Sequence, residues 1–151
     1  MQKIFDNTES LIELVNNILD ISKIEAGRFE ILWEEVNIND IIQKCVENFE
    51  ILYRDKGITL ILTNECTLDT IVTDRSKFIL ICNNLLSNAY KFTETNGKVE
   101  FHAFLEAECL FIKITDTGKG IEKEKLDHIF EKFNQMDNTN YTKKSIHGTG
   151  L

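Results

Sequence analysis

The stretch DRSKFILICNNLLSNAYKF, residues 74–92, decides the fold. Asp74 stands where a helix N-cap belongs, and we predict a helix from there to about Lys91. Its core face is predicted from apolar residues that recur at spacings of three and four, namely Phe78, Cys82, Leu85, Ala89 and Phe92. Asn84, Asn88 and Lys91 recur at similar spacing on a different face. The segment therefore predicts a helix with one apolar side and one polar side.

The polar side of this helix conflicts with helix propensity. Asparagine favours caps over helix interiors because its side chain competes for backbone groups, yet Asn83, Asn84 and Asn88 all lie inside the helix. Such conflicts are expected at functional sites. An amide oxygen can bind Mg²⁺ and a lysine such as Lys91 can bind phosphate. A solvated polar face explains the same residues and stays open on this pattern alone.

The rest of the chain mixes strands and helices. Alternation or short apolar runs predict strands over 29–34, 58–63, 70–73, 99–105 and 110–115. A second helix is predicted from Asn37 or Asn39 to about Lys56, and Gly57 ends it. Its predicted core face is Ile41, Ile42, Cys45, Val46, Phe49 and Leu52. A short helix over 122–129 and a polar loop over 134–150 follow, so the order of elements implies an α+β layer domain.

Residues 1–26 read as one long helix that stops at Gly27. Its apolar seam consists of Ile4, Leu11, Leu14, Val15, Ile18, Leu19, Ile21 and Ile24. A seam of this width packs either against a partner helix or against the chain's own domain, and the pattern favours neither.

Composition restricts the class of protein. A length of 151 residues with 42% hydrophobic and 28% charged residues predicts one globular domain, with room for an appendage. The net charge of −8 speaks against nucleic acid as a partner, and an anionic ligand must be met by local donors or a metal ion. No apolar run suggests a membrane span or a signal peptide, and the four scattered cysteines suggest buried, reduced thiols. We expect a cytoplasmic protein, or the cytosolic part of a membrane-anchored sensor.

A second polar motif, DTGKGI at residues 116–121, directly follows the predicted strand 110–115. Gly118 and Gly120 let the backbone turn tightly and approach a ligand. A carboxylate at a strand end, such as Asp116, can accept a hydrogen bond from the exocyclic amine of adenine. Taken alone, the motif favours an ordinary turn. The chain contains neither a P-loop nor the Gly-x-Gly-x-x-Gly dinucleotide fingerprint, which excludes those two nucleotide sites.

Four short segments, in order, resemble the motifs of sensor histidine kinases. NLLSNAYKFT at 84–93 resembles the N box, and DTGKGI at 116–121 resembles the G1 box. IFEKF at 129–133 is similar to the F box, and GTGL at 148–151 to the start of the G2 box. LDISKIEAG at 19–27 resembles the end of the second helix of the kinase dimerisation hairpin. The resemblance covers essentially the whole chain.

The resemblance implies a fold and two domains. Residues 28–151 would form the ATP-binding catalytic domain, stopping within the G2 box. That domain is a two-layer α/β sandwich with a mixed sheet, the Bergerat ATP-binding fold. Residues 1–27 would be the preceding helical dimerisation arm, packing in a homodimeric four-helix bundle. The implied cofactors are ATP and Mg²⁺.

The resemblance also implies roles for single residues. Asn88 would hold Mg²⁺ that bridges the ATP phosphates, with Asn84 supporting it, while Lys91 would contact phosphate. Phe92 would pack near the adenosine, and Asp116 would accept a hydrogen bond from the adenine amine. The glycines of the G1 box would close around the base beside Ile121, and Phe130 and Phe133 would anchor a lid. The implied ATP-binding set is Asn84, Asn88, Lys91, Phe92, Asp116, Gly118, Gly120, Ile121, Phe133, Lys143, Lys144, Gly148, Thr149, Gly150 and Leu151.

The implied activity is transfer of the ATP γ-phosphoryl group to a histidine of the dimerisation domain, for relay to an aspartate of a response regulator. In hydrolysing relatives a Glu activates water one turn before the metal-binding Asn; here Asn84 cannot act as a general base. None of His102, His128 and His147 lies in an H box, so the acceptor histidine is expected upstream. Two alternatives stay open: a regulatory ATP-binding module of the same fold, and a purely structural protein that binds no nucleotide.

Overall fold

The computed structural model of the chain describes residues 22–28 and 30–129. These residues fall into two compact units. One unit comprises residues 31–120, and the described part of the other comprises the short stretches 22–28, 30 and 121–129. Most of the predicted N-terminal helix, the F box after Ile129, the loop 134–150 and Leu151 lie outside the described residues.

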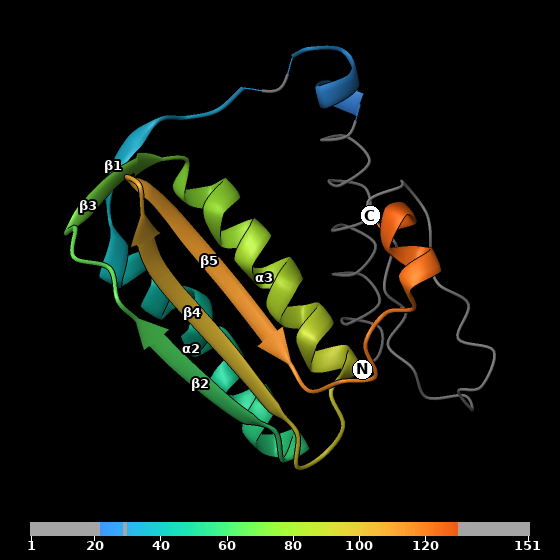
Figure 1. Ribbon diagram of the computed structural model, residues 1–151. Coiled ribbons are helices and arrows are strands. Elements are labelled where there is room, and N and C mark those ends of the chain that lie inside the picture. Colours follow the sequence, from blue (N-terminus) through green and yellow to red (C-terminus); the bar gives the residue numbers. More distant parts are fainter. Residues whose placement is uncertain (1–21, 29, 130–151) are drawn as a thin grey trace, which may run out of the picture. The chain divides into compact units, whose positions relative to one another are not determined.

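The larger unit is built on a three-stranded mixed sheet (Figure 1). Its strands are β2 (Thr59–Asn64), β4 (Lys98–Glu106) and β5 (Cys109–Asp116), in the order β2-β4-β5. β2 and β4 are parallel, whereas β4 and β5 form an antiparallel hairpin. The two residues of its turn, Ala107 and Glu108, both have positive φ, at 48° and 64°, as a type I′ turn requires. The predicted strands in this part of the chain are confirmed.

Two helices cover one face of this sheet (Figure 1). They are α2 (Ile38–Lys56) and α3 (Arg75–Phe92). Beside them, the short strands β1 (Glu34–Asn37) and β3 (Thr70–Thr73) pair antiparallel. The buried core is Val36, Ile38, Ile41, Ile42, Cys45, Val46, Tyr53, Ile58, Cys82, Leu86, Ala89, Val99, Phe101 and Ala103. This arrangement of helices on a mixed sheet confirms the α+β two-layer prediction.

Local capping explains where α2 begins and ends. The Asn37 side chain accepts a hydrogen bond from the Asp40 N–H at 3.0 Å, as an N-cap does. At the other end, Gly57 adopts φ +74°. The Gly57 N–H donates to the Arg54 carbonyl and the Ile58 N–H to the Tyr53 carbonyl, both at 2.9 Å. This is a Schellman motif, which favours glycine at that position.

One predicted strand is wrong in its position. Residues 30–33 are not strand, and β1 begins only at Glu34. Leu32 and Trp33 are 73% and 68% exposed, while the next buried residue is Val36. Alternation was the only signal for the earlier start, but the strand forms where β3 provides a partner, with Val36 opposite Ile71.

The predicted core faces of both long helices are wrong at one residue. Leu52 and Leu85 are 47% and 44% exposed, and their neighbours Tyr53 and Leu86 are fully buried instead. Both choices satisfy helical spacing, so periodicity alone could not separate them. The buried pair also links the helices, because the Tyr53 hydroxyl donates to the Leu86 carbonyl at 2.7 Å.

The four cysteines are free thiols, as expected, but only Cys45 and Cys82 are buried. Cys66 is half-buried and Cys109 is exposed. Within residues 22–28 and 30–129, no helix combines the length and the apolar character needed to cross a bilayer.

The smaller unit contains the ends of two predicted elements. Residues 22–25 are helical, and the helix stops at Gly27, with φ +65° and a hydrogen bond from the Arg28 N–H to the Lys23 carbonyl at 2.8 Å. The short helix predicted over 122–129 is a 3₁₀ helix, η1 (Lys123–His128). The Gly27 stop and the later helix are therefore both confirmed.

Candidate nucleotide-binding site

The polar helix α3 is fixed at its start by Asp74. One carboxylate oxygen of Asp74 accepts the Lys77 N–H at 3.0 Å, as predicted for an N-cap. The other accepts the Leu32 N–H, also at 3.0 Å, and so ties the segment before β1 to the helix. These backbone N–H groups, first that of Lys77 and then that of Leu32, hold the pKa of Asp74 below its ordinary value.

The two asparagines of the polar face present their amides to the surface. Asn84 and Asn88 are exposed, and neither side-chain amide makes a hydrogen bond within the described part of the chain. Four residues of α-helix rise about 6 Å, so the amides stand one turn apart, and Phe92 stands one turn beyond Asn88. Lys91 is half-buried, with Nζ 5.2 Å from the centroid of the Phe92 ring. One helix face thus carries two amides, a cation and an aromatic ring.

The turn after β5 meets the C-terminal end of α3. A Cβ atom on Gly118 would lie 2.5 Å from the carbonyl oxygen of Phe92. Only glycine permits this approach, which is to the helix backbone and not, as the motif alone suggested, to a ligand. Gly120 differs, because it has φ +69° and open space where a Cβ would stand.

Asp116 is positioned by the same turn. Its Oδ1 accepts the Gly118 N–H at 2.8 Å, and Oδ2 has no hydrogen-bond partner among the described residues. Burial and, after it, the negative charge of Asp116 raise the pKa of the buried Tyr53 above its ordinary value. The carboxylate therefore has one oxygen fixed and one available to accept a hydrogen bond from a ligand.

Two residues of the turn were missed by sequence reasoning. Thr117 joins the turn to the start of β4, because its N–H donates to the Lys98 carbonyl at 3.0 Å and its Oγ1 accepts the Lys98 N–H at 2.9 Å. Lys119 places its Nζ 5.2 Å from the Phe92 ring centroid. The sequence signals for these two residues were a hydroxyl and a cation next to glycines. Neither signal reveals the contact, because the partners Lys98 and Phe92 are distant in sequence.

The predicted site residues divide into three groups. The larger unit brings Lys91, Phe92, Asp116 and Gly118 together at the end of α3, with Asn84 and Asn88 on the preceding turns of that helix. Ile121 belongs to the other unit and is about half exposed. Outside the described residues lie Phe130, Phe133, Lys143, Lys144, Gly148, Thr149, Gly150 and Leu151.

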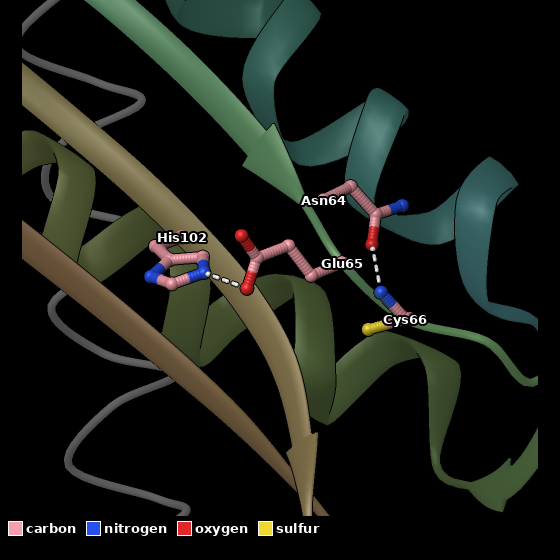
Figure 2. Close-up of polar contacts among 4 residues, drawn as sticks. All are labelled: Asn64, Glu65, Cys66 and His102. Atoms are coloured by element: carbon pink, nitrogen blue, oxygen red, sulfur yellow. Dashed lines mark hydrogen bonds and ion pairs between the residues drawn. The ribbon is translucent and has the colours of Figure 1, made fainter.

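His102 belongs to a different part of the sheet. It lies on β4, where its Nε2 is 3.0 Å from Glu65 Oε2 just beyond the end of β2 (Figure 2). The neighbouring Cys66 N–H donates to Asn64 Oδ1 at 3.0 Å in the same view. Among the described residues, no group of three or more His, Cys, Asp or Glu could hold a metal ion.

Comparison with known proteins identifies the class. Residues 73–151 match the family described as histidine kinase-, DNA gyrase B- and HSP90-like ATPases. An uncharacterized sensor-like histidine kinase of Rhizobium meliloti is 38% identical over 93% of this chain and 26% of its own length. The autoinducer 2 sensor kinase/phosphatase LuxQ of Vibrio harveyi is 37% identical over 95% of this chain and 17% of its own length. The full-length ShkA structure in complex with AMPPNP aligns with a TM-score of 0.77 and 28% identity, over 86% of this chain and 28% of that one.

The chain belongs to this ATPase family, since the family match covers just over half of it. Within the family it is an ATP-binding catalytic domain of the sensor histidine kinase type. The chain spans only about a sixth to a quarter of the length of the two curated relatives.

Proposed function

We propose that this domain binds Mg-ATP along the C-terminal half of α3 and transfers the γ-phosphoryl group to a histidine. The observation that carries the proposal is the meeting of the Asp116–Gly118 turn with the last turn of α3. This contact places the Asp116 carboxylate, which can accept a hydrogen bond from a purine amine, beside the face of α3 that can bind phosphates and a metal.

The proposed roles follow from the chemistry of each group. Asp116 accepts a hydrogen bond from the exocyclic amine of adenine through Oδ2, while Oδ1 keeps its hydrogen bond from the Gly118 N–H. Phe92 packs near the adenosine, and Lys91 compensates phosphate charge as a point charge. Gly120 and Ile121 complete the adenine side. Phosphate and lid contacts beyond these are proposed for Phe133, Lys143, Lys144, Gly148, Thr149, Gly150 and Leu151.

The described residues fit a magnesium ion supplied together with the nucleotide. Mg²⁺ in kinase sites takes one or two protein oxygens and completes its shell with phosphates and waters. Asn88 offers an exposed amide oxygen with no hydrogen-bond partner in the described part of the chain, and Asn84 offers a second one turn earlier. The ion would neutralise charge on the phosphates, which a protein of net charge −8 cannot do by its overall field.

Asn84 also bears on the direction of phosphoryl transfer. An amide cannot take a proton from water at neutral pH, so this position provides no general base for hydrolysis. The protein then contributes positioning and charge compensation, and a histidine supplied by another domain is the nucleophile.

The remaining proposals concern the complete protein. Residues 1–27 would form the end of a dimerisation hairpin in a homodimer, and residues 28–151 the catalytic domain. A response regulator would receive the phosphoryl group on an aspartate. The domain would act in the cytoplasm, where ATP is present and its four free thiols stay reduced.

A nucleotide titration tests the site. We expect Asn88→Ala to weaken binding of a fluorescent ATP analogue only when Mg²⁺ is present. Asp116→Ala should weaken binding with or without Mg²⁺ and reduce the preference for adenine over guanine nucleotides. Asn48→Ala, which removes an exposed asparagine of α2, is the matched control. Unchanged affinity in both site variants would refute the assignment.

A phosphotransfer assay tests the reaction. The chain is mixed with a separately purified phosphoacceptor hairpin of a histidine kinase and ATP labelled at the γ position. Acid-labile label on the hairpin is the expected result. Tight nucleotide binding without transfer would favour the regulatory module, and release of free phosphate would instead indicate a hydrolase.

A further inference from the structure

A second lysine, which does not belong to the helix α3, lies at the proposed nucleotide site. Lys119 stands between the two glycines of the turn after β5, and its Nζ lies over the Phe92 ring at 5.2 Å from the centroid. Lys91, at the end of α3, places its own Nζ at the same distance from the same ring. Two ammonium groups from segments distant in sequence therefore share one aromatic side chain.

We infer that Lys119 acts with Lys91 as a two-cation contact for the nucleotide phosphates, and that Lys119 sets how strongly the site prefers a triphosphate over an uncharged nucleoside. This inference rests on the proposed nucleotide function of the site. It adds a specificity-determining residue that the motif itself does not require, since the chemistry of the turn needs only its aspartate and glycines.

Two lysines from different segments beside one ring of the proposed site support a polyanionic ligand. Phosphates placed beside the ring would attract both ammonium groups. The local concentration of positive charge is also unexpected for a chain with 25 acidic and 17 basic residues.

A structural role for Lys119 makes a different prediction. Cations near the C-terminus of a helix stabilise it through the helix dipole, and Lys91 is in the last turn of α3. If Lys119 served only this purpose, its removal would lower stability and weaken all ligands alike. If it contacts phosphate, its removal would affect ligands in proportion to their phosphate charge.

The test compares Lys119→Gln with two other variants of the full chain. Lys113→Gln removes the same charge from β5, the strand before the turn. Lys113 is exposed between the core-facing residues Ile112 and Ile114 and so lies on the other face of the sheet. Lys119→Arg keeps the charge. Dissociation constants are measured for ATP, ADP and adenosine at low and high salt, with thermal unfolding of each variant as a control for folding.

We expect Lys119→Gln to weaken ATP binding about fivefold at low salt, the effect of a partly exposed ion pair worth about 1 kcal/mol. ADP should lose less, adenosine should be unchanged, and high salt should reduce the difference. Lys113→Gln and Lys119→Arg should bind like the wild type. Equal losses for ATP and adenosine, or no loss for ATP, would overturn the inference. Absence of nucleotide binding by the wild type would instead refute the proposed function itself.

Discussion

Substitution of Gly118 by alanine should uncouple the turn proposed to bind adenine from α3. The added Cβ would stand 2.5 Å from the Phe92 carbonyl oxygen, 2.9 Å from its carbonyl carbon and 2.7 Å from Asp116 Oδ1. Favourable contacts between carbon atoms begin near about 3.5 Å, so the overlap is about 1 Å. Because two of these atoms belong to a helix backbone, no side-chain rotation relieves it, and the turn itself must move.

Two quantities follow from that displacement. Overpacking of this kind costs about 1–3 kcal/mol of folding free energy. A movement of about 1 Å would also carry Asp116 away from the adenine that it is proposed to bind, and positioning errors of that size have large effects on function. We expect nucleotide affinity to fall at least about tenfold, or about 1.4 kcal/mol.

Gly57→Ala separates the two effects. Gly57 has φ +74°, and a Cβ there would meet only the Thr95 methyl group at 3.1 Å, so alanine costs about 1–2 kcal/mol through backbone strain without touching the site. Urea unfolding followed by circular dichroism gives the stabilities, and calorimetric titration with Mg-ATP gives the affinities. The reasoning is refuted if Gly118→Ala binds nucleotide as tightly as Gly57→Ala does.

Three further predictions concern stability. Replacing Ala107 by Asn and Glu108 by Gly should raise the free energy of unfolding by about 1–2 kcal/mol, because both residues have positive φ; an unchanged urea midpoint would contradict this. Leu86→Ala should cost about 2–5 kcal/mol and Leu85→Ala less than about 1 kcal/mol, since only Leu86 is fully buried; similar losses in both would contradict the assignment. The folded pKa of Asp74 is lowered, so its ionised form contributes stability above the unfolded pKa of about 3.9 that is lost as pH falls through the folded value. The Asp74→Ala variant should therefore melt at a lower temperature than the wild type near neutral pH, and its melting temperature should fall less on acidification. Melting temperatures that change with pH in parallel in the two proteins would contradict this prediction.

Features with a local cause could be predicted from the sequence. Asp74 begins α3, and Gly57 ends α2, because each forms hydrogen bonds within its own helix terminus. The helical pattern alone does not predict whether Leu85 or Leu86 is buried. Both fit the spacing, and only packing against α2 and the sheet decides which one is buried.

Features that depend on distant partners could not be predicted. β1 begins at Glu34 because β3 pairs there, a constraint that alternation in residues 29–34 does not contain. In the candidate site, the amide face of α3 is visible in the sequence as a spacing of four. The position of Lys119 over Phe92 depends on how the turn after β5 closes onto the helix, and no local pattern records it.

The parallel pairing of β2 with β4 has a consequence for the order of folding. Thr59 aligns with Lys98, so β3 and all of α3 lie within the loop that this pairing closes. Closing such a loop lowers the chain's entropy before the new strand contacts stabilise it, and non-local strand pairing slows folding in general. During synthesis the helix that carries both amides must leave the ribosome before the strand that completes its support. The chain therefore cannot assemble the proposed nucleotide-binding face progressively from the N-terminus, and that face is supported by the full sheet only when the crossover is complete.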